Sequence, residues 1–124
     1  MTMSEAAKSF TFISRSPPYG SNRPQLCLDA ALATAVFEQE VNYLFLDDGV
    51  FQLMRNQQGD AIQAKTLGNA IETLDLYGID NVLVDADSLR RRDLAAEDLL
   101  LEAKVVSEDE VRELLARSDF VVNL

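Results

Sequence analysis

The segment Val41–Leu46 constrains the fold more than any other part of the chain. All but one of its residues are apolar, and the run stops at the turn-forming sequence Asp47-Asp48-Gly49. A short apolar run bounded by a turn is typical of a strand that is covered on both faces. Such strands belong to parallel sheets, because helical crossovers cover both faces of those sheets. The sequence therefore predicts an α/β fold.

Strands and helices are predicted to alternate along the rest of the chain. The predicted strands are Ser9–Ser14, Val41–Leu46, Val82–Val84, Ala103–Val106 and Asp119–Asn123. The predicted helices are Gln25–Glu40, a segment marked by Leu67, Ile71, Leu74 and Leu76 that ends near Gly78, and Glu108–Arg117. Helices between strands imply right-handed crossovers. We therefore expect a three-layer fold with a mostly parallel five-stranded sheet and helices on both faces.

Capping residues place the starts of the helices. Pro24 suits the first turn of a helix, and Ser107 followed by Glu110 forms a capping box. The segment Asp87–Leu94 is predicted to be a turn or a short helix, with Asp87 or Ser88 able to cap its start.

Length and hydropathy indicate one domain. The chain has 124 residues, 48% of them hydrophobic, which suffices for a single core. We expect a disordered polar tail at residues 1–8 and one domain at residues 9–124. No apolar stretch reaches the roughly 18 residues that a membrane span needs, and the tail has no apolar signal-peptide centre. These features predict a cytoplasmic protein without membrane contact.

Composition excludes several classes of chemistry. Cys27 is the sole cysteine and there is no histidine, so internal disulfides, common zinc sites and histidine acid–base catalysis are excluded. Neither GxGxxG nor a P-loop sequence occurs, so no nucleotide cofactor is expected. The net charge of −10 opposes direct binding to nucleic acid. The basic run Arg90-Arg91-Arg92 is more typical of a solvated helix face than of a phosphate site.

Aspartates follow two predicted strands and have two interpretations. Asp47-Asp48 and the pair Asp85 and Asp87 would meet at the carboxyl edge of a parallel sheet, where carboxylates can hold Mg²⁺ in a receiver-like domain. A receiver domain, however, places paired acids after its first strand, and here that strand ends in Ser14-Arg15-Ser16. We favour the interpretation that these aspartates cap turns and helices.

Cys27 also has two interpretations. A lone cysteine in an α/β protein could act as a nucleophile or carry a persulfide. Cys27, however, lies early in a predicted helix, between Leu26 and Leu28, and not in a loop at a strand end. Free cysteine commonly packs as a small apolar residue, so we favour a structural role.

Apolar residues gather in two predicted loops. They are Tyr19, beside Pro17-Pro18, and Val50, Phe51, Leu53 and Met54, directly after the Asp-Asp-Gly turn. Apolar loop residues beside strand ends suggest a subunit interface. The alternative, that Phe51 and Met54 cover the domain's own core, is equally compatible with the sequence.

Several segments together resemble the TusC/DsrF family of DsrE-like proteins. The most specific is Leu44-Phe45-Leu46-Asp47-Asp48-Gly49-Val50-Phe51-Gln52-Leu53. Further similar segments are Ile13–Gly20, Asp29–Ala33, Val84–Arg90 and Ser118–Val122, so that the resemblance spans residues 9–124.

The resemblance implies a non-catalytic subunit of a sulfur-relay complex. The implied partners are TusB/DsrH-like and TusD/DsrE-like subunits in a 2:2:2 heterohexamer, with a TusA-like sulfur donor and a TusE/DsrC-like acceptor. A TusBCD-type complex would act in 2-thiouridine modification of tRNA wobble positions, which we favour over DsrEFH-type sulfur oxidation. In the family the relay cysteine belongs to the TusD/DsrE subunit; Asp85 occupies the matching turn here and cannot hold a persulfide. An independent sulfurtransferase that uses Cys27 is the enzyme-class alternative.

Overall fold

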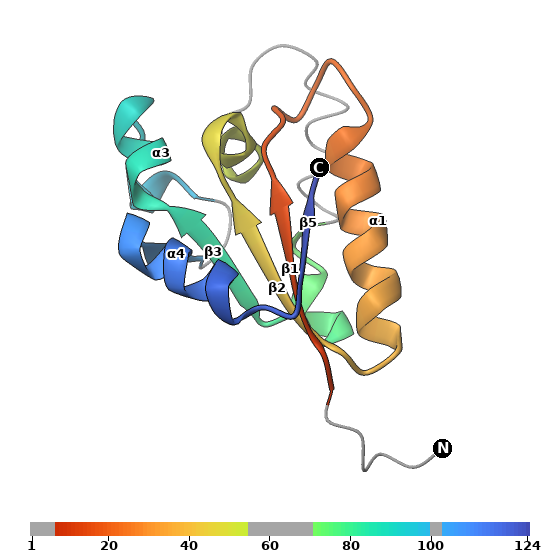
Figure 1. The fold of residues 1–124 in the computed structure, drawn as a ribbon. Coiled ribbons are helices and arrows are strands. Elements are labelled where there is room, and N and C mark those ends of the chain that lie inside the picture. Colours follow the sequence, from red (N-terminus) through yellow and green to blue (C-terminus); the bar gives the residue numbers. More distant parts are fainter. Residues whose placement is uncertain (1–6, 55–70, 100–102) are drawn as a thin grey trace.

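The fold is a five-stranded parallel sheet between two layers of helix (Figure 1). The computed structural model describes residues 7–54, 71–99 and 103–124. The strands are β1 (Ser9–Ser14), β2 (Glu40–Phe45), β3 (Asn81–Asp85), β4 (Lys104–Val106) and β5 (Phe120–Asn123). They lie in the order β4-β3-β2-β1-β5, and every neighbouring pair is parallel. The predicted α/β fold class is confirmed.

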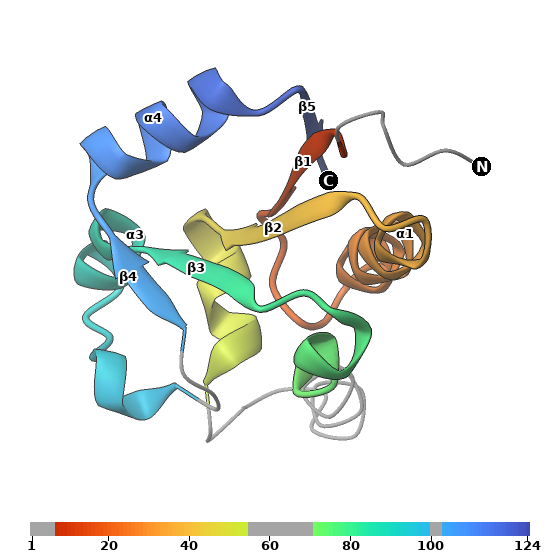
Figure 2. The same ribbon diagram turned by 90° about the horizontal axis from the view of Figure 1, so that it is seen from below.

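Helices cover both faces of the sheet (Figure 2). One face carries α1 (Arg23–Val36) and the 3-10 helix η2 (Leu74–Tyr77), and the other carries α4 (Glu108–Arg117). The alternation of side chains along each strand supplies both cores. Phe12 and Tyr43 pack in the cluster beneath α1, whereas their neighbours Ile13 and Leu44 pack in the cluster beneath α4.

Two predicted helices differ in their bounds. The helix predicted at Gln25–Glu40 begins earlier and ends at Val36, and Glu38 then adopts a φ of 61°, which turns the chain toward β2. The segment predicted from Leu67 to Leu76 lies partly outside the described residues. Its described end is η2, which stops at Gly78 in the left-handed conformation, as predicted.

The capping box of α4 is confirmed. The Glu110 backbone N–H donates to Ser107 Oγ at 3.2 Å, and the Ser107 N–H donates to Glu110 Oε1 at 3.0 Å. The predicted cap of the short helix α3 (Ala86–Arg91) was wrong. Asp85 caps it, because this carboxylate at the last position of β3 accepts the Ser88 N–H at 3.0 Å.

The 3-10 helix η1 (Asp47–Leu53) was not predicted. The sequence indicated a simple turn at Asp47-Asp48-Gly49, followed by a loop. The chain instead continues in tight turns that bring Val50 and Leu53 into the core. A further short 3-10 helix, η3 (Ala96–Asp98), precedes β4. Within the described ranges, no helix is long and apolar enough to span a bilayer.

Candidate functional site

The ends of β1, β2 and β3 meet at the carboxyl edge of the sheet, next to η1 and α3 (Figure 1). This edge is where open parallel sheets commonly bind ligands. The backbone N–H of Leu46 donates to the carbonyl of Ser14 at 3.1 Å, which joins the ends of β1 and β2. The three strand ends therefore form one continuous surface.

Asp85 and Ser88 link the end of β3 to the end of β2. Asp85 Oδ2 accepts from the Ser88 hydroxyl at 2.7 Å as well as from its N–H, and the hydroxyl in turn accepts the Asp47 N–H at 2.9 Å. Asp85 and Ser88 are buried. Asp47 adopts a φ of 52°, so this link holds a residue in the uncommon left-handed region. The resemblance places Asp85 at the position of the relay cysteine, and here its Oδ2 caps a helix and accepts two hydrogen bonds from Ser88.

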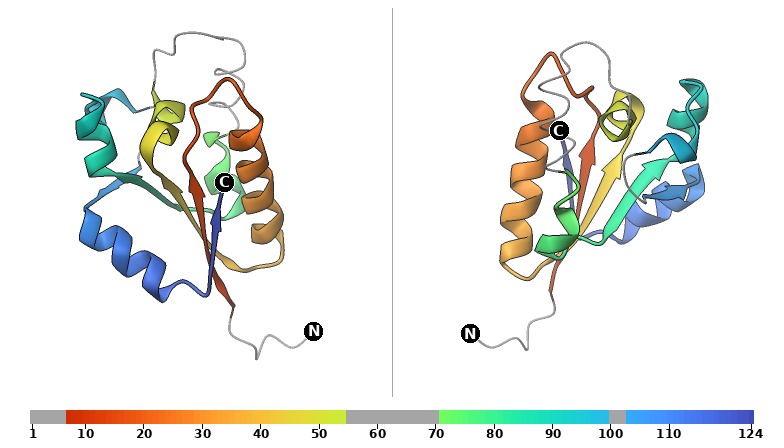
Figure 3. Two further views of the ribbon diagram at one scale, coloured as in Figure 1. Left: turned by 45° about the horizontal axis from the view of Figure 1, so that its top comes forward. Right: turned by 180° about the vertical axis from the view of Figure 1, so that it is seen from behind.

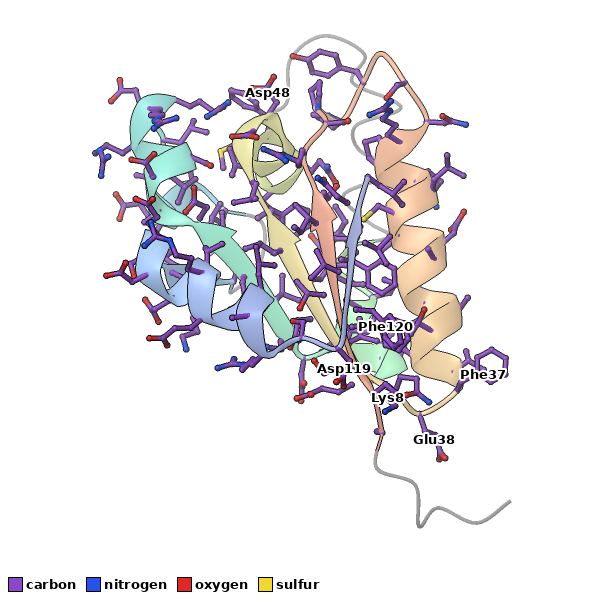
Figure 4. All side chains as sticks on the ribbon, in the orientation of Figure 1. Lys8, Phe37, Glu38, Asp48, Asp119 and Phe120 are labelled. Carbon is purple, nitrogen blue, oxygen red and sulfur yellow. The ribbon has the colours of Figure 1, made fainter. Side chains whose placement is uncertain are left out.

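Arginines neutralise the acidic groups of this edge. Arg15 contacts Asp47 Oδ2 through Nε at 2.9 Å and Nη2 at 2.8 Å, and Arg92 contacts Asp48 Oδ1 through Nε and Nη2 at 3.0 Å each. Figure 4 shows Asp48 at this end of the molecule. Asp87 pairs with two further arginines, Arg90 and Arg91 of α3. The basic run is thus engaged in ion pairs.

These pairings bear on the magnesium interpretation. Among the described residues no group of three or more carboxylate, cysteine or histidine side chains is placed to hold a metal ion. Each aspartate instead pairs with an arginine or, in the case of Asp85, caps a helix. The expected capping role therefore holds for Asp85, whereas Asp47, Asp48 and Asp87 form ion pairs.

Gly49 and Gln52 fix η1 against the end of β1. A Cβ atom on Gly49 would lie 2.0 Å from the carbonyl oxygen of Ser14, so that only glycine permits this approach. Gln52 Nε2 donates to Ser14 Oγ and to the Ser16 carbonyl, each at 2.8 Å. Its Oε1 is buried and has no hydrogen-bond partner in the described structure.

Cys27 lies on the inner face of α1 and is fully buried. Its thiol points at the carbonyl of Ile13, with Sγ to O at 3.8 Å. Burial raises the pKa of the Cys27 thiol, and the nearby hydroxyls of Tyr43 and Ser14 offset this in part. Burial likewise raises the pKa of Tyr43 well above its usual range, and its neighbour Cys27 raises it further. A buried thiol with a raised pKa is a poor nucleophile.

The residues of the predicted interface have different environments. Val50 and Leu53 are fully buried and Met54 nearly so, all packed in this chain's own core. Phe51 is half-buried against the same core, and Tyr19 is exposed. Of the five predicted interface residues, only Tyr19 and the outer part of Phe51 are therefore accessible to another subunit. The interface itself stays a prediction.

Sequence reasoning missed four residues of this edge. Arg15, Ser88 and Arg92 were not assigned to the aspartates that they contact, and Gln52 was not assigned to the end of β1. Gln52 is the polar residue within the apolar run Val50–Met54, and this break was a signal for a buried hydrogen bond.

Comparisons with known proteins identify the family. The profile of the DsrE/DsrF-like family matches residues 8–124. This chain belongs to that family. It is 40% identical over 118 residues to a "Protein TusC homolog" of Pseudomonas aeruginosa, covering 95% of this chain and 99% of the relative. It is 41% identical over 98 residues to the "Intracellular sulfur oxidation protein DsrF" of Allochromatium vinosum, covering 79% of this chain and 72% of that protein.

Solved structures support the DsrE-like fold. The crystal structure of the YchN protein from Escherichia coli superposes with a TM-score of 0.77. The alignment covers 94% of this chain and 99% of YchN at 18% sequence identity. At this identity the likeness extends to the fold alone, and the resemblance to TusC and DsrF rests on the sequence relatives.

Proposed function

We propose that this chain is a non-catalytic structural subunit of a sulfur-relay complex. The names of its relatives, TusC and sulfur oxidation protein DsrF, support a role in sulfur transfer. The non-catalytic assignment depends on one observation, the position and hydrogen bonding of Asp85. It lies in the turn where the family resemblance expects the relay cysteine of another subunit, and its carboxylate caps α3. A carboxylate offers no sulfur atom on which a persulfide could form.

The state of Cys27 supports the same assignment. Sulfur transfer between proteins requires that the thiolate of one protein reaches the persulfide of the other. The Cys27 side chain is inaccessible, and burial raises its pKa and so disfavours the thiolate. This argues against the alternative of an independent sulfurtransferase that uses Cys27.

The proposed assembly is a cytoplasmic heterohexamer of the TusBCD type. TusB/DsrH-like and TusD/DsrE-like subunits would join this chain in two copies each, and the relay cysteine would belong to the TusD/DsrE-like subunit. A TusA-like protein would supply sulfur and a TusE/DsrC-like protein would accept it, toward 2-thiouridine at tRNA wobble positions. This chain itself would contact neither tRNA nor membrane. The match to the TusC homolog covers 99% of that protein, whereas the match to DsrF covers 72% of that protein, and this difference favours the TusBCD branch over the DsrEFH type.

The test is reconstitution with the paralogous subunits encoded by neighbouring open reading frames. Light scattering should give the mass of a mixed hexamer. The Cys27→Ser variant should transfer sulfur at nearly the wild-type rate within that hexamer, whereas removal of the partner's relay cysteine should abolish transfer. A chain that stays monomeric in the presence of both paralogues, or loss of transfer in Cys27→Ser hexamers, would contradict the proposal.

The two branches differ in the phenotype of a deletion. Loss of the gene should lower 2-thiouridine in tRNA if the chain acts in tRNA thiolation. The identity to DsrF is the specific observation that favours the second branch. In that case the deletion should leave tRNA thiolation intact and slow the oxidation of stored sulfur.

A further inference from the structure

The two edges of the sheet differ in how they are protected from other strands. The edge strand β4 is three residues long and carries the exposed Lys104. A short strand with a lysine is a common protection against pairing with foreign strands. The other edge strand, β5, reads Phe-Val-Val-Asn and contains no charge and no proline. Such an edge is rarely left free on a protein that remains monomeric.

The backbone of β5 has a free side. Its inner side pairs with β1, where Phe10 to Ile13 align with Phe120 to Asn123, and no described strand lies beyond it (Figure 3). The Leu124 N–H donates to the Ile13 carbonyl at 3.0 Å. Because backbone groups alternate in direction along a strand, the N–H and C=O groups of Val121 and Asn123 then point away from β1. These groups are available to another strand.

Apolar side chains flank this free edge on both faces of the sheet. Phe120 is 50% exposed and stacks on Phe10 with ring centroids 4.8 Å apart, on the α1 face. Val121, the next residue, points to the opposite face and is 45% exposed. Phe37, which is 72% exposed, lies at the same end of the molecule (Figure 4). A partner strand on β5 would cover apolar surface on both sides of the new pair.

Charge distinguishes between a second copy of this chain and a different partner. The chain carries a net charge of −10, so two copies repel each other. Glu38, Asp119 and Lys8 lie at the start of this edge (Figure 4), and α4 ends just before it at Arg117. A partner strand flanked by lysine or arginine complements the net negative charge of the chain, whereas a second copy of β5 does not.

We propose that β5 pairs with an edge strand, flanked by basic residues, of a different subunit, so that the two sheets become continuous. This inference rests on the proposed function, because the partner is one of the paralogous relay subunits. Strand addition combines main-chain hydrogen bonds for affinity with side-chain contacts for selectivity. Val121 would contribute outward-facing backbone groups to the hydrogen bonds and an exposed side chain to the contacts, which makes it the central residue of this interface.

Two matched pairs of variants test the proposal in the co-expressed complex. Val121→Cys places an accessible thiol on β5, and Val105→Cys places one on β4, where the valine is 40% exposed. The native Cys27 is buried, so its own reaction with the thiol reagent should add little background labelling. Assembly should slow the labelling of Val121→Cys by about tenfold or more relative to the free chain, and leave that of Val105→Cys within about twofold, because interface cores exclude solvent. Labelling of this chain is measured by mass spectrometry.

The second pair uses charge. Val121→Lys should raise the dissociation constant of the complex by about tenfold or more, as expected for a central interface residue. Val105→Lys should leave it near the wild-type value.

The outcomes separate this inference from the proposed function. If the complex assembles but Val121→Cys labels as fast as in the free chain, or if both edges are equally protected, the assignment to β5 is overturned while the proposed function stands. If the free chain self-associates and Val121→Lys makes it monomeric, the partner is a second copy and the proposal is wrong. If no complex forms with either paralogue, both fail together.

Discussion

The carboxyl edge of the sheet and the free edge of β5 differ in whether their groups find partners within the chain. At the carboxyl edge, hydrogen bonds and ion pairs within the chain engage Ser14, Asp47 and Asp85. At β5, backbone groups and two half-exposed apolar side chains lack such partners among the described residues. The usual binding edge of a parallel sheet is thus closed by the chain itself, and the lateral edge is open.

The two edges therefore leave different groups available to other molecules. A catalytic turn needs a reactive group free of strong local partners, whereas Asp85 is committed to Ser88 and α3. An assembly edge needs unpaired backbone and apolar surface, which β5 retains. The following predictions alter one edge or the other, and they should affect folding at the first and association at the second.

The largest effect on folding is expected from Gly49→Ala. The added Cβ would meet the Ser14 carbonyl oxygen at 2.0 Å, and this contact is with backbone that can shift only by separating η1 from β1. We expect a loss of roughly 3 kcal/mol in the free energy of unfolding, at the upper end of overpacking effects. Urea unfolding followed by circular dichroism measures it.

Gly78→Ala is the control for Gly49→Ala. Gly78 has a φ of 84° but has open space around its Cβ position. The variant should cost about 1 to 2 kcal/mol, the usual strain of a left-handed alanine. A Gly49→Ala variant as stable as Gly78→Ala would show that the close approach to Ser14 is dispensable.

An intermediate effect is expected from Ser88→Ala. The variant removes the hydroxyl that joins Asp85 to the Asp47 N–H and leaves a part-buried donor without its acceptor. The cost should be about 1 to 3 kcal/mol, the range for an unsatisfied buried group. Ser16→Ala, in a loop and partly exposed, with a hydroxyl that has no hydrogen bond within the described residues, should change stability by less than about 0.5 kcal/mol in the same urea titration. Equal midpoints for the two variants would contradict the importance of this link.

The contrast between the edges also shows which features could be predicted from the sequence. Strand β1 and helix α4 have the predicted bounds, because an apolar alternation before Pro17-Pro18 and a capping box are local signals. The helix η1 was missed because it depends on contacts between segments far apart in the chain. The cap at Asp85 is a local contact with Ser88, and it was missed because the cap was assigned to Asp87 or Ser88, beyond the actual end of β3. The Ser88–Asp47 and Gln52–Ser14 bonds span 41 and 38 residues, and single-sequence patterns contain no information on such pairs.

The interface prediction illustrates the same limit. The apolar run after Gly49 indicated either a partner surface or a domain core, and periodicity alone does not separate the two. The tight 3-10 turns place Val50 and Leu53 inward. The exposed edge of β5 could not be recognised, because a strand's place in the sheet order depends on topology and not on its own sequence.

A small effect is expected from Val121→Lys in the isolated chain. Val121 lies on the free edge and is nearly half-exposed, so the free energy of unfolding should change by less than about 0.5 kcal/mol. Val122→Lys is the matched control, because Val122 packs against the core beneath α1 and its replacement should cost about 1 kcal/mol or more. A large loss of stability in Val121→Lys would mean that β5 needs this side chain for folding, and loss of assembly in that variant would then be uninformative.

The smallest effect is expected from Glu110→Gln, which lies away from both edges and tests local capping alone. The hydrogen bond from the Ser107 N–H holds the pKa of Glu110 below its usual value of 4.5. A carboxylate with a lowered pKa stabilises the fold above its unfolded-state pKa, and this contribution is lost as the pH falls through the folded-state pKa. Glutamine can complete the capping box but carries no charge. The wild type should therefore be slightly more stable than Glu110→Gln at pH 7, and the two should converge in thermal melts as the pH falls below the folded-state pKa of Glu110. Glu113→Gln, outside the capping box, corrects for the loss of one negative charge, and a stability difference that persisted unchanged at acid pH would show that the charge of Glu110 has no role in the cap.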